Sequence, residues 1–298
     1  MLLIVVFILI GSIVATVTSV SEDTYILDEY VNRTIEYEQI YMMADLALEA
    51  VEEIFRNDNP DVDYFGEYWS ENITVPIENG QITVTIVDQE RFLNPNFLVN
   101  KKDKIDQRYF KIFQRLFFML DINETVLYNI IDWIDKNKIS NGGIEIYPDF
   151  PAKNRKVDTL DELRLIQGIN SQIFNGYVSQ GQFKPGLKSV LSPYTNGKVN
   201  VNTASKWVLM SLDQDIDETL ANAIISYRKS KPFKNLNDLN LVDGVTGDII
   251  HRISPVADVK SSNFLVNMDI KIGDRDYRLI FLVERTGKKI REKWRKVY

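Results

Sequence analysis

The first twenty residues of the chain carry no charged side chain. An uninterrupted apolar run occupies residues 2–10, and the first basic residue is Arg33. About twenty apolar residues in a helix match the ~30 Å hydrocarbon core of a bilayer. A secretory signal peptide would need a basic start, a shorter apolar stretch and a small-residue cleavage site. We therefore expect residues 1–20 to be the transmembrane part of a helix.

The next segment, residues 21–57, contains no glycine or proline and spaces its apolar residues at roughly helical intervals among acidic ones. This pattern predicts that the membrane helix continues beyond the bilayer as one rod of about 57 residues, or ~85 Å at 1.5 Å per residue. The sequence Asn57-Asp58-Asn59-Pro60 is expected to end the rod. The alternative is an ordinary membrane anchor followed by a separate amphipathic helix.

Composition and charge limit the function classes. About 240 of the 298 residues lie beyond the rod, which is enough for one large or two modest cores. The chain has no cysteine, so disulfides and thiolate metal sites are excluded on it. Its net charge of −7 disfavours a nucleic-acid surface. Acidic Glu22 and Asp23 follow the apolar run, and we expect that side of the membrane to be the periplasm.

Two predicted β-hairpins bracket a helical middle. The first joins 73–77 to 81–87 through Asn79-Gly80, and the second joins 264–272 to 277–283 through Gly273-Asp274. Helical patterns lie between them at 109–120, 124–134, 161–166, 171–177, 204–212 and 216–229. The simplest arrangement is one antiparallel sheet interrupted by a helical insertion. We therefore predict an α+β fold, with a sheet body from 58–94 and 259–298 and an inserted α-helical domain at 95–258.

The helical block contains an internal repeat. Residues 162–169 align with 238–245, each as a helix, a glycine turn and a second helix, and 204–229 is a looser third copy. Such helix-hairpin-helix units can hold DNA phosphates on backbone N–H groups. Acidic residues surround the turns and would repel phosphate: Asp213, Asp215, Asp217, Asp243 and Asp248. We expect these units to serve packing and protein contacts, with no nucleic acid bound.

Several stretches together resemble the minor pseudopilin K family of the type II secretion system, also called general secretion pathway protein K. They are Ile131–Asp135, Gly143 with Glu145, Asn154, Asp161–Leu165, Asn200–Ser205, and Lys231–Phe233 before Asp238-Leu239. The order of segments fits over nearly the whole chain. The resemblance implies a pilin-like long N-terminal helix packed on a small antiparallel sheet, with a large all-α insertion.

The resemblance also implies function, location and partners. A member of this family acts at the tip of the pseudopilus, where it helps initiate assembly and protein export across the outer membrane. Its partners would be minor pseudopilins I and J, with minor pseudopilin H, the major pseudopilin, secreted cargo and the outer-membrane channel as further candidates. The chain would cross the bacterial inner membrane once and contact its lipid, with the C-terminal domain in the periplasm.

Two N-terminal residues bear on assembly. Most pilin-like proteins carry a membrane-buried glutamate at the fifth mature position, where it pairs with the N-terminal amine of a neighbouring molecule. Counting Met1 as the processed N-terminus, this chain has Val5 there. A buried carboxylate is costly unless it is paired, so its absence suits a tip protein with no other molecule ahead of it. The alternative is that Val5 simply faces lipid. The family's leader, which ends in glycine, is not in this sequence.

One acidic segment is a candidate calcium site. Asp132, Asp135, Asn137 and Glu145 crowd a stretch that contains Gly142-Gly143, and hard oxygen ligands on a loop suit Ca²⁺. The spacing is not that of an EF-hand. The alternative is that the two aspartates end a helix while the polar residues form turns. The family resemblance, which implies calcium in the helical domain, favours a structural Ca²⁺ ion.

No catalytic motif stands out. The single histidine, His251, has no serine or cysteine partner in an elbow motif, and no phosphate-binding glycine loop occurs. We expect no enzyme. The basic run from Lys288 to Lys296 is interpreted as a solvated tail, with lipid headgroups or an acidic partner as alternatives. Two other function classes remain open, a membrane-tethered DNA-binding or uptake protein and a membrane-anchored hydrolase.

Overall fold

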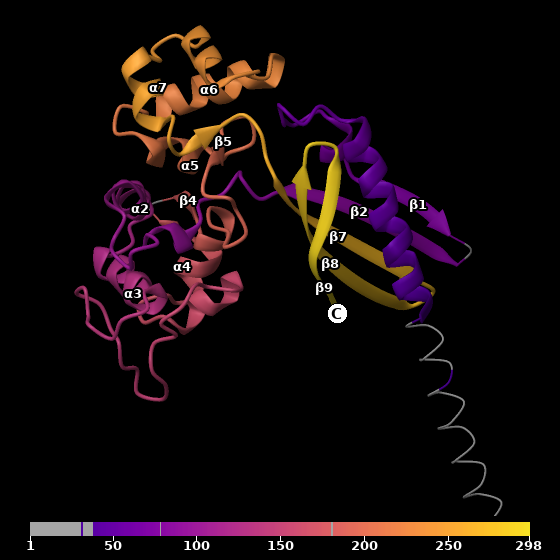
Figure 1. Ribbon diagram of the computed structural model, residues 1–298, viewed down its shortest axis with the longest axis horizontal. Helices are drawn as coiled ribbons and strands as arrows, with labels where there is room; N and C mark the ends of the chain where they lie inside the picture. Colours follow the sequence, from indigo (N-terminus) through magenta and orange to yellow (C-terminus); the bar gives the residue numbers. More distant parts are fainter. Residues whose placement is uncertain (1–30, 32–37, 78, 180) are drawn as a thin grey trace, which may run out of the picture. The chain divides into compact units, whose positions relative to one another are not determined.

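Five strands form one antiparallel sheet in the order β1-β2-β7-β8-β9 (Figure 1). The computed structural model describes residues 31, 38–77, 79–179 and 181–298. The strands of this sheet are β1 (Ile73–Ile77), β2 (Gly80–Asp88), β7 (Asn263–Ile272), β8 (Arg275–Thr286) and β9 (Lys289–Val297). β2 pairs with β7 along its whole length, although 174 residues separate Asp88 from Asn263 in the chain. The predicted single sheet, interrupted by an insertion, is therefore confirmed.

Both predicted hairpins are present. β1 and β2 pair with Ile77 opposite Gly80, and β7 and β8 pair with Ile272 opposite Arg275. Glycine is required at position 80 because a Cβ there would lie 1.7 Å from the carbonyl oxygen of Lys271 on the neighbouring strand. Gly80 is thus the first residue of β2, without a positive φ, and it is needed for the close approach of β7.

The basic C-terminal run is the edge strand β9, so its interpretation as a solvated tail was wrong. Gly287, with φ +60°, turns the chain from β8 into β9. Thr286 lies opposite Lys289 and Leu279 opposite Val297. An edge strand tolerates lysine and arginine because one side of it faces solvent, and the same charges discourage further strand pairing. These charged residues leave little alternation of apolar and polar positions, so the sequence pattern did not indicate a strand.

Short helices account for most of the regular secondary structure of the insertion. The α-helices are α2 (Gln107–Met119), α3 (Glu124–Ile134), α4 (Ser171–Asn175), α5 (Lys206–Leu212), α6 (Glu218–Ser230) and α7 (Gly247–Ile253). The 3₁₀ helices of the described chain are η1 (Tyr68–Ser70), η2 (Pro95–Phe97), η3 (Leu160–Leu165), η4 (Leu187–Ser189) and η5 (Leu236–Leu241). The segment expected to be helical at 161–166 thus has the tighter 3₁₀ form.

The insertion also contains two small sheets that the sequence did not predict. β3 (Gly176–Ser179) pairs antiparallel with β4 (Gln182–Pro185), and β5 (Val199–Asn200) pairs parallel with β6 (Ala257–Asp258). Helix α4 was expected to run to residue 177. It ends at Asn175 because Gly176 takes φ +102° and starts β3.

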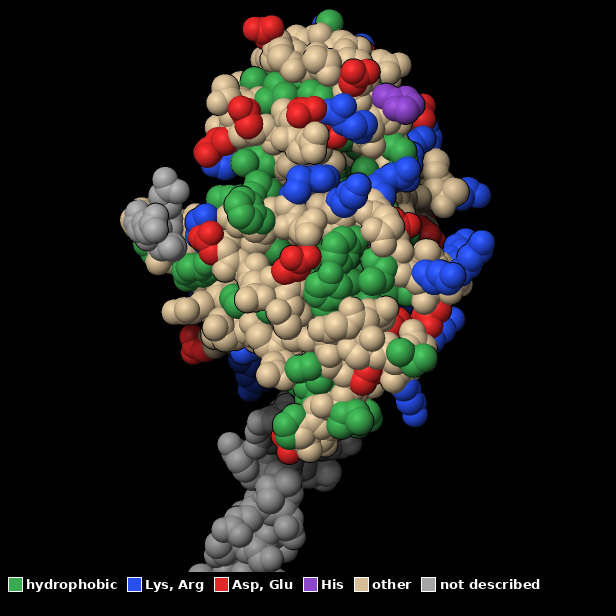
Figure 2. Space-filling model, turned by 90° about the vertical axis from the view of Figure 1, so that its left-hand side faces the viewer, with side chains coloured by type: hydrophobic (Ala, Val, Ile, Leu, Met, Phe, Trp, Pro, Cys, Tyr) green, Lys and Arg blue, Asp and Glu red, His purple; other side chains and the backbone are tan. Residues whose placement is uncertain are grey.

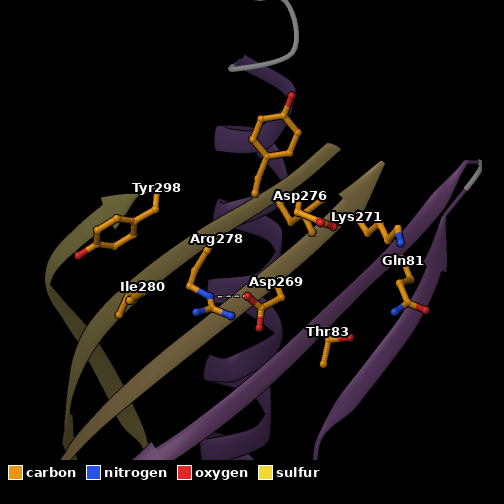
Figure 3. A pocket seen from close by; sticks show the side chains of 10 residues that line it. Gln81, Thr83, Asp269, Lys271, Asp276, Arg278, Ile280 and Tyr298 are labelled. Atoms are coloured by element: carbon orange, nitrogen blue, oxygen red, sulfur yellow. Dashed lines mark hydrogen bonds and ion pairs between the residues drawn. The ribbon is translucent and has the colours of Figure 1, made fainter. Parts of the chain in front are cut away.

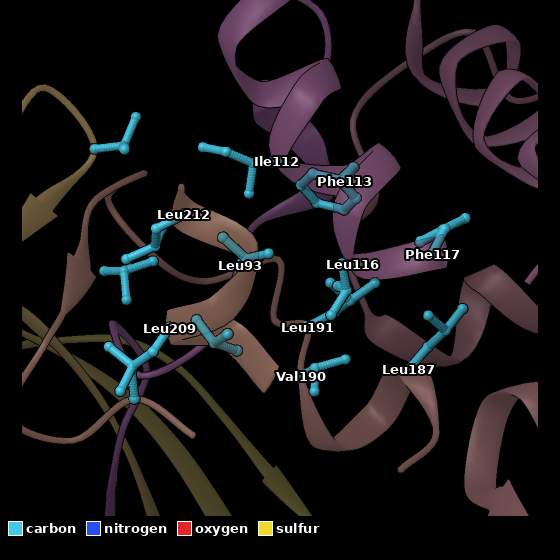
Figure 4. Packing of buried hydrophobic residues seen from close by; sticks show 14 of the residues in the cluster. Leu93, Ile112, Phe113, Leu116, Phe117, Leu187, Val190, Leu191, Leu209 and Leu212 are labelled. Atoms are coloured by element: carbon cyan, nitrogen blue, oxygen red, sulfur yellow. The ribbon is translucent and has the colours of Figure 1, made fainter. Parts of the chain in front are cut away.

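A continuous apolar core holds the insertion together (Figure 4). Asp106 caps α2 by accepting hydrogen bonds from the Arg108 and Tyr109 backbone N–H groups. The helix then buries one face, built from Ile112, Phe113, Leu116 and Phe117. Figure 4 shows these side chains converging with others from the segment before β5 and from α5, namely Leu187, Val190, Leu191, Leu209 and Leu212. Residues far apart in the sequence of the insertion therefore share one core.

A separate aromatic group lies on the sheet body. The Phe264 ring on β7 lies 4.6 Å from Phe55 and 5.3 Å from Trp69, measured between ring centroids. The guanidinium of Arg285 lies over the rings of Phe55 and Phe264. These rings are buried, so together they contribute much of the apolar area that stabilises the body.

The described part of the N-terminal helix covers residues 38–57 and ends at Asn57, where the sequence predicted its end. Tyr41, Met42 and Leu46 on it are exposed. The predicted transmembrane part, with Met1 and Val5, and most of the predicted rod before residue 38 lie outside the described residues. Within the described ranges, no helix combines the length and apolar character needed to span a membrane. The predicted domain limits at 94/95 and 258/259 stay a prediction.

Candidate functional site

Three carboxylates meet at the end of α3. Asp132 lies in the last turn of the helix, Asp135 is its C-terminal cap, and Glu145 comes from the loop that follows. One carboxylate oxygen of each lies within 4.8 Å of the others. We call Asp132, Asp135 and Glu145 the carboxylate cluster. The structure thus brings together three of the four residues that the sequence indicated for calcium.

Asp132 organises the loop around itself. Its carboxylate accepts hydrogen bonds from Ser140 Oγ (2.8 Å), Asn141 N (2.8 Å) and Gly143 N (3.0 Å). Gly143 must be glycine, because a Cβ there would lie 2.5 Å from the carbonyl group of Tyr128 in α3. The loop can therefore bring Glu145 back to the end of α3 only because Gly143 packs directly against the Tyr128 backbone.

The other two carboxylates each keep a buried oxygen without a partner. Asp135 Oδ1 and Glu145 Oε1 accept no hydrogen bond from any described residue. Burial, followed by the charges of Glu145, Asp103 and Asp132, raises the pKa of Asp135 to about 6. Burial, and then Asp132, also raises the pKa of Glu145. Two orphaned, mutually repelling oxygens are what a bound cation would satisfy.

Asn154, one of the residues that carry the family resemblance, also lies at the carboxylate cluster. It takes the unusual φ of +51°. Turned so that its amide nitrogen points inward, it donates to the Asp132 carbonyl oxygen and to Glu145 Oε2, each at 3.2 Å. In the other orientation its amide oxygen faces these same two acceptors, an arrangement that a cation would stabilise. Asn154 lies nine residues after Glu145, and this spacing does not indicate a metal ligand in the sequence.

Asn137, the fourth residue that the sequence indicated for calcium, does not direct its amide oxygen to the carboxylate cluster. Its Oδ1 accepts a hydrogen bond from Ile139 N (2.7 Å), while its Nδ2 donates to Asp135 Oδ2 (2.9 Å). Its amide oxygen is therefore used in the turn after α3, and its nitrogen is what reaches the cluster. The role of Asn137 as a ligand stays a prediction.

The two repeated units have the same local structure. η3 and η5 each begin with a capping box, Gly168 and Gly244 have φ of +92° and +90°, and α4 and α7 follow. The caps of these helices, Asn170 and Thr246, accept hydrogen bonds from Ile173 N and Ile249 N. Side chains of the protein thus already use these helix-start donors.

The surface charges around these units are mixed. Asp213 and Asp215 pair with Arg252 at 2.7 Å and 2.5 Å. Figure 2, which shows one face of the molecule, has acidic and basic side chains interspersed over it. A DNA-binding surface would need a concentrated basic patch. His251, on α7, is exposed.

Comparisons with known proteins agree with this architecture. The family described as "Type II secretion system (T2SS), protein K" matches residues 92–178, and a helix-hairpin-helix motif family matches residues 195–256. The type II secretion system protein K of Pectobacterium carotovorum subsp. carotovorum is 23% identical over 248 residues, which cover 76% of this chain and 73% of that protein. The chain is thus similar to type II secretion system protein K, over residues 92–178 by the family model and over 248 residues by this relative.

The fold is also similar to that of a solved type II secretion structure. A chain in the crystal structure of the GspK-GspI-GspJ complex from enterotoxigenic Escherichia coli matches with a TM-score of 0.71 at 20% identity. The match covers 90% of this chain and 99% of that one. The family resemblance and the α+β fold predicted from the sequence are both confirmed.

One motif behind the protein K resemblance, Asn200–Ser205, fixes the insertion to the sheet. The buried Asn200 donates from Nδ2 to the Asp63 carbonyl oxygen (3.0 Å) and to Ser261 Oγ (2.9 Å). Thr203 Oγ1 donates to Asp88 Oδ2 at the end of β2 (2.5 Å). Burial raises the pKa of Asp88. We call Asp63, Asp88, Asn200, Thr203 and Ser261 the junction.

Proposed function

We propose that this protein is a minor pseudopilin at the tip of the type II secretion pseudopilus, where it helps initiate assembly and protein export. The similarity to type II secretion system protein K carries the proposal. The likeness of fold to a chain of the GspK-GspI-GspJ complex supports I-type and J-type pseudopilins as partners, with minor pseudopilin H and the major pseudopilin as further contacts. In this proposal the chain crosses the bacterial inner membrane once, its C-terminal domain lies in the periplasm, and it performs no catalysis.

The described helix supplies a candidate contact. Met42 and Leu46 lie one helical turn apart and are 66% and 63% exposed. Exposed apolar side chains at this spacing are suited to packing against another helix. Together with Met1 and Val5 at the expected N-terminal end, they form the part of the chain that we assign to assembly.

Co-purification tests the proposal. The full-length chain, expressed with I-type and J-type pseudopilins from the same organism, is expected to form a ternary complex. Changing both Met42 and Leu46 to Asp should abolish that complex. Leu241→Asp, at a residue of η5 that is 56% exposed, is the matched control and should leave the complex intact. Failure of the unaltered chain to bind either partner contradicts the assembly function.

We also propose that the carboxylate cluster holds a structural Ca²⁺ ion. The buried, unpartnered oxygens of Asp135 and Glu145 support this, as does a donor set made only of oxygen atoms. Asp132 and the amide oxygen of Asn154 complete the candidate set, with Asn137 as the further ligand predicted from the sequence. When bound, the ion would neutralise the carboxylates and join the end of α3 to its loop.

Calorimetry with the full-length chain tests the calcium proposal. Calcium should bind and raise the unfolding temperature, since a ligand at 100 times its Kd stabilises by about 2.7 kcal/mol. The double variant Asp135→Asn/Glu145→Gln should bind none, whereas Asp149→Asn, at an exposed aspartate of the same loop, should bind normally. Equal calcium binding by the double variant and the unaltered chain contradicts the site.

A further inference from the structure

One face of the large sheet is hollowed into a trough. A cavity of about 630 Å³ opens there, lined from β2, β7, β8 and the residue after β9. Figure 3 shows Gln81, Thr83, Asp269, Arg278 and Ile280 on the face of the sheet that looks toward the viewer. Ligand cavities in proteins are typically about 300–1,000 Å³. The trough therefore has the size of a binding site.

The floor of the trough offers mainly side chains. β2 and β7 pair with a strand on both sides, as does β8 from Arg278 onward, so the backbone N–H and C=O groups there are used in the sheet. Over most of the floor a ligand therefore cannot add to the sheet as another strand. It must be recognised by the side chains that project from these strands.

The charges in the trough balance. Arg278 Nε lies 2.6 Å from Asp269 Oδ1, and Lys271 lies opposite Asp276 on the neighbouring strand. Two cations thus accompany two carboxylates, in contrast to the overall acidity of the chain. A neutral, mixed surface gives no net attraction to a polyanion or a polycation. This favours a ligand without net charge.

The remaining groups are those that bind polar, ring-shaped ligands. Gln81 and Thr83 present an amide and a hydroxyl, each able to donate and to accept. Tyr298 is 66% exposed, and its backbone pairs with Arg278 in both directions, at 2.8 Å and 3.2 Å. The aromatic ring is therefore carried by a fixed backbone at the border of the trough. Aromatic side chains combine a large apolar face with a polar tip.

The trough also continues toward the insertion. A second cavity of about 330 Å³ shares Ile280 and Tyr298 with the first and includes Trp294. The Trp294 ring lies 5.4 Å from that of Tyr194, between centroids. The two hollows thus follow one another, with aromatic residues beside the second. Such an elongated shape suits a chain molecule better than a single small one.

We propose that this trough binds a neutral oligosaccharide. Sugar hydroxyl or acetamido groups would bond to Gln81, Thr83 and the Asp269–Arg278 pair, while the apolar face of a sugar ring packs on Tyr298. The residues that line this site include neither Met42 and Leu46 nor the carboxylate cluster. It does not depend on the assembly function.

Binding is tested with the full-length chain in a detergent that has no sugar headgroup. The probes are the tetramers of N-acetylglucosamine and of glucose, measured by calorimetry, with a heparin oligosaccharide as the charged competitor. At least one neutral tetramer should bind saturably, and heparin should not displace it. Tyr298→Ala and Gln81→Ala should each weaken binding about fivefold or more.

Tyr68→Ala is the matched control, because Tyr68 is 64% exposed and lies outside the trough. It should change affinity less than about twofold. Circular dichroism of both trough variants must match the unaltered chain, and Gln81→Ala decides the result if Tyr298→Ala is misfolded. The proposal is refuted if neither tetramer binds at 10 mM (roughly the weakest useful affinity), if heparin displaces the sugar, or if Tyr68→Ala weakens binding as much as the trough variants do.

Discussion

Replacing Asn200 by alanine should destabilise the protein more than most single substitutions do. Asn200 is fully buried and makes contacts on both sides of the junction. Its Nδ2 group donates to the Asp63 carbonyl oxygen at 3.0 Å and to Ser261 Oγ at 2.9 Å. Its Oδ1 accepts from Asn202 N at 2.9 Å. Alanine keeps none of these three bonds.

The expected loss follows from these contacts. Three buried hydrogen bonds at about 1 kcal/mol each, plus about 1 kcal/mol for a partner left unsatisfied, give a decrease of about 4 kcal/mol in the free energy of unfolding. Asn200→Asp should also be destabilising, because it would place a second carboxylate 3.3 Å from Asp88 Oδ2, where Nδ2 now lies. Acid should partly relieve the Asp variant and leave the Ala variant unchanged.

Urea unfolding of the full-length chain, followed by tryptophan fluorescence, measures the effect. Asn222→Ala is the matched control, since Asn222 is exposed on α6 and should change stability by less than about 0.5 kcal/mol. A loss below about 1 kcal/mol for Asn200→Ala would show that the junction bonds are replaced by water, and the reasoning would fail.

Three further predictions concern single residues. Arg285→Met should cost about 3–5 kcal/mol because it strands the buried Asp63 carboxylate, and adding Asp63→Asn should restore part of that loss in the same urea assay. Burial raises the pKa of Glu67 from 4.5 to about 7, so the native state binds a proton that the unfolded chain releases, and stability falls as pH rises between these values. Thermal midpoints of Glu67→Gln should fall less over that window, and equal slopes would contradict the assignment. Gly143→Ala should weaken calcium binding measured by calorimetry, whereas Gly247→Ala, with open space around its Cβ, should not.

Much of the fold follows from local sequence signals. The Asn79-Gly80 and Gly273-Asp274 turns, each between alternating apolar residues, predicted β1, β2, β7 and β8. The edge strand β9 escaped prediction because its exposed positions carry lysine and arginine. The strand pair β3–β4 begins at Gly176, whose positive φ ends α4. Such short elements depend on tertiary contacts that sequence periodicity does not record.

Only part of the candidate metal site could be predicted, because local sequence signals mark some of its residues and not others. Asp132 and Asp135 lie close together on one helix end, and Gly143 lets the loop bring Glu145 back to them. Asn154 comes from beyond that loop, and only the folded chain places it at the cluster. The helix end could be read from the sequence, whereas the path of the returning loop could not.

The way the insertion enters and leaves the sheet determines what the junction must do. The chain leaves β2 after Asp88 and re-enters β7 at Asn263, and these ends are neighbours, since Gln89 N donates to the Asn263 carbonyl oxygen at 2.9 Å. The pairing of β2 with β7 therefore does not require contacts from the insertion. Fixing the helical part is left to contacts such as those of Asn200 and Thr203 with the end of β2. Weakening the junction should consequently release the insertion as one unit while the β2–β7 pairing persists, and hydrogen exchange would then increase in α2 to α7 before it does in β7.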